Sequence, residues 1–71
     1  MTRSRTVYRI RVGVHLDDKW SSWFSGFDIA PLGEDKTLLE GAVPDQAALY
    51  AVLTKIRDLG LPLLSVHRVG V

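Results

Sequence analysis

The stretch DDKWSSWFSGF, residues 17–27, contains both tryptophans and both phenylalanines of a 71-residue chain. Its four aromatic residues are spaced i, i+3, i+4 and i+7, which predicts one face of a short amphipathic helix: Trp20, Trp23, Phe24 and Phe27. An aspartate precedes this face as a candidate N-cap, and Gly26 suits a left-handed C-cap. Because aromatic side chains bury large areas, we expect Trp20 and at least one of Trp23 and Phe24 in the core. The alternative is that one indole is exposed for a partner.

Outward from this stretch, the pattern predicts strands and one long helix. Residues 7–16, VYRIRVGVHL, alternate apolar and polar side chains, as a half-buried strand does. Residues 27–43 predict a hairpin whose turn contains Pro31 and the letters GEDK, so its first strand is short or lies at an edge. Residues 44–62 predict a helix capped by Asp45, with Leu49, Val52, Leu53, Ile56 and Leu59 on its buried face. Residues 63–71 predict a last strand of uncertain phase.

The predicted order is strand, short helix, strand, strand, long helix, strand. This order predicts an α+β fold, a two-layer α/β sandwich of the ferredoxin-like β-α-β-β-α-β type with a short first helix. The ten residues 17–26 are few for a crossover between parallel strands. The alternative is therefore a three-stranded meander followed by a helix and a strand, with the aromatic stretch forming a helical corner.

Composition limits the classes of protein that fit. Hydrophobic residues make up 46% and charged residues 24%, as in a globular domain, and the net charge is +1. There is no cysteine, which excludes disulfides and thiol chemistry. No apolar run could span a bilayer, and residues 1–12 lack the core of a signal peptide. We expect a cytoplasmic protein with a flexible basic tail at residues 1–6 and one domain at residues 7–71.

Three segments resemble a family of small bacterial proteins known mostly as hypothetical proteins: YRIRV, HLDDKWSSWFSGF and VPDQAALYAVLTKIRDLGLPLLSV. The resemblance covers residues 8–69, and its last segment is the most specific. It implies a stand-alone cytoplasmic domain and brings no catalytic or binding residues with it.

Histidine chemistry has little support in the sequence. His15 and His67 are the only histidines, and a metal site would need a third ligand such as Asp28 or Glu40. Ser65 and His67 share a face of the last strand, but no orienting acid or oxyanion loop accompanies them. We therefore predict no catalytic residue, no metal site and no cofactor.

The N-terminal arginines are the candidate contacts for nucleic acid: Arg3, Arg5, Arg9 and Arg11. The outward positions of the first strand carry no aromatic residue for base stacking, which ranks nucleic acid below other partners. We expect Asp28 and Glu40 to lie on the same face and to pair with the arginines.

The leading hypothesis is a small non-enzymatic interaction or assembly module that forms a homodimer. A cysteine-free chain of this length gains stability by burying more surface, and the last strand has more apolar residues than one covered face requires. The predicted self-association residues are Leu63, Leu64, Val66 and Leu38. Another protein partner stays open, no membrane partner is expected, and the alternatives are a nucleic-acid-binding protein or a small-ligand-sensing regulatory domain.

Overall fold

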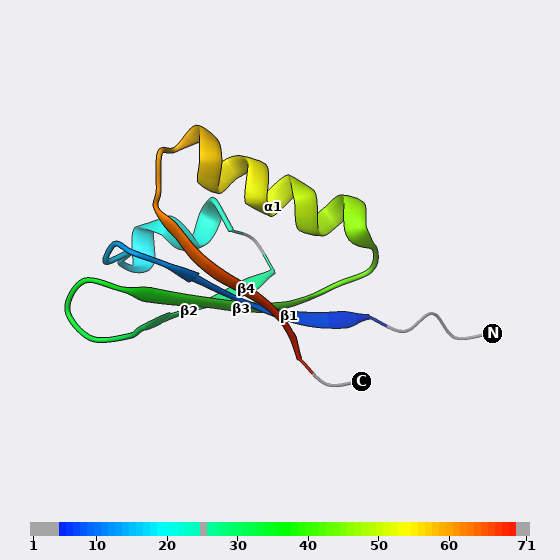
Figure 1. Cartoon of the computed structure of the whole chain (residues 1–71), viewed down its shortest axis with the longest axis horizontal. Helices are drawn as coiled ribbons and strands as arrows, with labels where there is room; N and C mark the ends of the chain where they lie inside the picture. The colour runs from blue at the N-terminus through cyan, green and yellow to red at the C-terminus, as the bar shows by residue number, and fades with distance from the viewer. Residues whose placement is uncertain (1–4, 25, 70–71) are drawn as a thin grey trace.

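The structure is a computed structural model that describes residues 5–24 and 26–69. Four strands form one antiparallel sheet in the order β2-β3-β1-β4, and the helix α1 lies across one face of it (Figure 1). The strands are β1 (Thr6–Val12), β2 (Phe27–Pro31), β3 (Thr37–Val43) and β4 (Leu63–Val69). The helix α1 spans Gln46–Asp58, and a short 3₁₀ helix, η1, spans Asp18–Ser22. The molecule is thus a two-layer α+β domain with one open sheet face.

The predicted ferredoxin-like β-α-β-β-α-β arrangement is wrong, because the described residues contain one α-helix and not two. The aromatic stretch forms only η1, in which the N–H of Trp23 donates to the carbonyl of Trp20 three residues earlier. Gly26 then takes a positive φ of 89°, and Phe27 enters β2. The meander alternative is also wrong, since β3 lies between β1 and β2.

The length of the connection explains why no α-helix forms here. The first strand ends at Val12 and not at Leu16 as predicted, and the next residues are tied to β3 by hydrogen bonds from and to the Thr37 hydroxyl. Few residues then remain before Phe27, and three of them are serines, Ser21, Ser22 and Ser25, a residue type that forms helix poorly. A single 3₁₀ turn is the compact way to bring the chain back to the sheet.

The aromatic side chains divide between core and surface. Phe24 is 1% exposed and Phe27 is buried, which confirms the core prediction for both phenylalanines. Trp20 is half-buried and packs against the core, whereas Trp23 is 51% exposed. Their indole rings lie 6.2 Å apart between centroids. The predicted four-residue buried face therefore holds for the phenylalanines, in part for Trp20, and not for Trp23.

The long helix agrees with its prediction. The Asp45 side chain accepts a hydrogen bond from the N–H of Ala48 at 2.9 Å and caps the N-terminus. Gly60 takes a positive φ of 72°, and the N–H of Leu61 donates to the carbonyl of Ile56, which is the C-terminal arrangement that glycine favours. The buried face consists of Leu49, Val52 and Ile56.

Alternation along the strands separates the two faces of the sheet. The helix-covered face contains the fully buried Ile10, Val12 and Leu39, which form the centre of the core. The opposite face is not covered by any described segment (Figure 1). Its outward positions carry the charged residues of β1, β2 and β3, which are Arg9, Arg11, Asp28 and Glu40.

Thr37 is the one buried polar residue in the described core, and it supports a first prediction. Its hydroxyl donates to the carbonyl of Val14 at 2.7 Å and accepts from the N–H of Leu16 at 2.9 Å. Thr37→Val keeps the shape but leaves a buried N–H unpaired, so the free energy of unfolding should fall by about 1–3 kcal/mol in urea denaturation. Thr54→Val, at an exposed position of α1, is the control and should change it by less than about 0.5 kcal/mol.

Candidate functional site

Two surfaces of the described molecule lack a covering layer. The first is the β4 edge, residues 62–69, which includes the outermost strand of the sheet. Strand β4 pairs only with β1, so the backbone groups along its outer side have no strand partner among the described residues. Leu63 and Leu64 are 48% and 50% exposed, and both belong to this edge. Apolar side chains beside an unpaired strand edge favour pairing with another chain.

A register shift explains why two consecutive leucines are both exposed. Val12 pairs with Leu63 and Arg11 pairs with Ser65, which leaves Leu64 as an extra residue in β4. Such a bulge interrupts the strict alternation of the strand. Leu64 therefore lies over Gly13 on the open face, where a Cβ on this glycine would be 3.4 Å from the Leu64 side chain.

The other two predicted self-association residues lie elsewhere. Val66 pairs with Ile10, is half-buried and packs against the core, so it supports the sheet and contributes little surface. Leu38 lies on β3, and β1 separates that strand from β4. The structure thus brings Leu63 and Leu64 together but leaves Leu38 two strands away.

The opposite edge of the sheet is less suited to pairing. Strand β2 is only five residues long and ends in Pro31, which lacks an N–H to donate. The turn that follows contains Glu34, Asp35 and Lys36, all exposed. Charge and proline are common means of protecting a sheet edge, so β4 is the edge that stays open to a partner.

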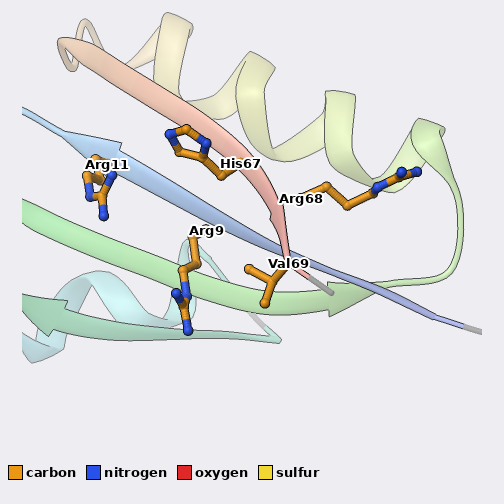
Figure 2. Close-up of a pocket in the computed structure, with 5 residues that line it drawn as sticks. All are labelled: Arg9, Arg11, His67, Arg68 and Val69. Carbon is orange, nitrogen blue, oxygen red and sulfur yellow. The ribbon is translucent and has the colours of Figure 1, made fainter. Parts of the chain in front are cut away.

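The second surface, called here the basic depression, is a shallow hollow of about 380 Å³ lined by Arg9, Arg11, His67, Arg68 and Val69. Figure 2 shows Arg9 and Arg11 extending from β1 on the same side of the sheet, with His67 on the neighbouring strand and Arg68 pointing away from the other arginines. Arg9 and His67 are directly paired across β1 and β4. Strand pairing therefore brings Arg9 and Arg11 next to His67, which lies 56 or more positions further along the sequence.

Charge on the open face is unevenly distributed. The Arg9 Nε lies 2.6 Å from a carboxylate oxygen of Glu40, which confirms the predicted pairing of an arginine with this acid. Asp28 lies opposite Glu40 in the strand register of β2 and β3, so both acids lie on the β2–β3 side of the open face. Within the described part of the chain, Arg11 forms no ion pair. Arg68 does not add to the charge of this face, because it pairs with Tyr8, whose side chain packs against the core on the opposite side. The β1–β4 side is consequently basic and the β2–β3 side acidic.

The predicted nucleic-acid contacts are only partly brought together. Arg9 and Arg11 share the basic depression, whereas Arg5 lies before β1 and borders a separate hollow of about 340 Å³ with Lys55 and Phe27. Arg3 lies outside the described residues. Sequence reasoning considered His67 as a metal ligand and as the partner of Ser65, and did not place it beside Arg9. The signal that was available is the position of His67 on a strand predicted to neighbour the arginine-bearing one.

The histidine and serine candidates show no catalytic geometry. His15 lies beyond the end of β1 and is exposed, so it is not on a strand that pairs with His67. The Ser65 hydroxyl is buried and has no hydrogen-bond partner, hence it does not donate to the His67 ring. No group of three metal-binding side chains occurs among residues 5–24 and 26–69.

This geometry defines the class of protein: a small α+β domain whose sheet has one covered face and one open face. Comparison with known sequences identifies the family. The model of a domain of unknown function (DUF8691) matches residues 7–67. The chain therefore belongs to this family. No curated protein and no solved structure matches it. No helix of the described structure has the length and apolar character needed to cross a membrane.

Proposed function

We propose that this protein is a non-enzymatic interaction module that forms a homodimer through the β4 edge. The observation that carries the proposal is the open outer side of β4 beside two half-exposed leucines. The proposal includes a cytoplasmic location and a bacterial source, which the sequence resemblance implies. It assigns the protein a role in assembly, which the exposed Leu63 and Leu64 beside the open β4 edge support.

A dimer with its twofold axis beside β4 would pair the free backbone groups of this edge and cover its exposed leucines. Antiparallel pairing of β4 with its copy would supply partners for the outer backbone groups and double the four-stranded sheet. Leu63 and Leu64 would then be covered by the same residues of the second chain, because a twofold interface is self-complementary. The domain is small, so this extra burial matters for its stability.

The dimer gives a second prediction. Light scattering at micromolar concentration should report twice the chain mass of 7.9 kDa. Leu63→Lys with Leu64→Lys should weaken the dimer about tenfold or more per leucine, since burial of each apolar side chain contributes about 1.5–3 kcal/mol. Both side chains are half exposed in one chain, so the fold should survive, as circular dichroism can check.

Tyr50→Lys is the matched control. Tyr50 lies on α1 and is 58% exposed, so it carries a similar change from apolar to charged away from β4. This variant should keep the parent mass. A parent protein with a mass of 7.9 kDa at micromolar concentration, unchanged by the two leucine substitutions, would contradict the proposal.

A nucleic-acid-binding role is the second candidate, and the position of Arg9 and Arg11 side by side on the open face supports it. Two observations weaken it. Among the described residues, no Phe, Tyr or Trp lines the basic depression, so the imidazole of His67 is the one ring there on which a base could stack. Arg9 already pairs with Glu40, which reduces the charge available to a phosphate backbone.

A further inference from the structure

We propose that the basic depression binds a small phosphate monoester, a dianion carrying a compact apolar group. All of its lining residues belong to one chain, so this inference does not depend on the proposed dimer. It goes beyond an assembly role by giving the open face a ligand.

The hydrogen-bond donors of the basic depression are spaced for one phosphate group. Arg9 and His67 are directly opposite each other on β1 and β4, and Arg11 lies two residues further along β1 on the same face. Strands rise about 3.3 Å per residue, which separates the two arginine backbones by about 7 Å. Side chains of this length can converge on one tetrahedral anion, and a guanidinium donates two parallel hydrogen bonds to a phosphate.

The balance of charge on this side favours an anion. Arg11 has no acidic partner among the described residues, and Glu40 engages only the Nε of Arg9. The two terminal nitrogens of Arg9 thus remain available as donors. Glu40 is also the one carboxylate paired with a lining arginine, so it would compete with the ligand.

The size and lining of the hollow indicate a small ligand. Its volume of about 380 Å³ is near the lower end of the range for small-molecule sites. Next to the cationic row, Val69 and Val7 pair across β4 and β1, and Val7 pairs with Ala42 of β3. These side chains share the open face and form an apolar strip beside the cations. A monoester would place its phosphate on the arginines and its organic part on this strip.

The test is titration of the full chain with butyl phosphate, followed by amide chemical shifts in NMR. The largest shifts should fall on Arg9, Arg11, His67 and Val69. Butyl phosphate should bind more tightly than inorganic phosphate, because only the ester contacts the apolar strip. Arg11→Gln should weaken binding about tenfold, the effect of losing one charge-assisted hydrogen-bonding group.

Two further variants distinguish specific binding in the basic depression from non-specific attraction to the positive charges of the protein. Glu40→Gln should strengthen binding about threefold, because it frees Arg9 from its competitor; a merely structural role for this ion pair would not increase affinity. Arg57→Gln removes the same charge from α1, where Arg57 pairs with Asp58, and should leave binding unchanged.

Three results would overturn the inference. The first is the absence of localised shifts at millimolar butyl phosphate. The second is an equal loss of affinity in Arg11→Gln and Arg57→Gln, which would show non-specific attraction. The third is an oligothymidylate of about ten nucleotides that binds more than about 100-fold more tightly than butyl phosphate, with a steep salt dependence lost in Arg11→Gln. That outcome would assign the surface to single-stranded nucleic acid.

Discussion

Phe24→Ala should lower the free energy of unfolding by about 3–5 kcal/mol, because it empties a fully enclosed aromatic site. Phe24 is 1% exposed and is among the largest fully buried side chains of the described core. Domains of ordinary size have only about 5–15 kcal/mol of stability, and one this small has less apolar burial to draw on. Urea denaturation followed by circular dichroism should show the variant largely unfolded without denaturant.

Trp23→Ala is the matched control, one position earlier in the same segment. Trp23 is 51% exposed, and its contact with Lys55 uses the backbone carbonyl, which alanine keeps. The variant should lose no more than about 1 kcal/mol. Equal losses for the two variants would mean that the aromatic segment packs as the predicted helix and not as η1.

Gly41→Val should destabilise the sheet by at least about 3 kcal/mol, at the upper end of overpacking effects. A Cβ at Gly41 would lie 2.6 Å from the carbonyl oxygen of Gly26 and 2.9 Å from the Phe27 ring. Phe27 is the direct cross-strand partner of Gly41, so its ring occupies the space that a side chain would need. The obstacle includes backbone, which cannot move aside as a flexible side chain can. Thermal unfolding would measure the loss.

Gly13→Ala provides the comparison within the same chain. A Cβ there meets the side chains of Pro62 and Leu64 at 3.4 Å, which is close to ordinary contact. Its effect should stay below about 1 kcal/mol. A tolerated Gly41→Val beside a damaging Gly13→Ala would contradict the close approach of β2 and β3.

Where local sequence determines structure, the predictions agree with the fold. The long helix has its cap, its apolar face and its C-terminal glycine within one continuous segment, so α1 could be predicted in detail. The structure of the aromatic stretch could not be predicted in this way. Its aromatic residues have the spacing of an α-helix, but the connection between β1 and β2 has room for only one 3₁₀ turn. That space is limited by Thr37, whose hydroxyl forms hydrogen bonds with Leu16 and Val14, the residues that follow β1. These two residues lie 21 and 23 positions before Thr37 in the sequence. Tertiary constraint of this kind outweighs helical periodicity in a short segment.

The candidate surfaces likewise combine features that local sequence predicts with features that depend on long-range strand pairing. The pairing of Arg9 with Glu40 follows from alternation on two strands and could be predicted. The exposure of both Leu63 and Leu64 depends on the register shift between Arg11 and Val12, which has no local sequence signal. The position of His67 beside Arg9 was missed because the phase of β4 is set by its pairing with β1, and the sequence of β4 alone leaves that phase open.

The position of β1 between β3 and β4 has a consequence for how the protein is made. Of the four strands β1 leaves the ribosome first, yet one of its neighbours, β4, is the last to emerge. Until β4 emerges, β1 can pair with β3 on one side only, and residues such as Val7 lack their β4 partner, here Val69. Such long-range pairing slows folding and leaves strand edges open to aggregation. We expect chains cut short before β4 to depend on chaperones and to be degraded, even though they retain every residue of α1.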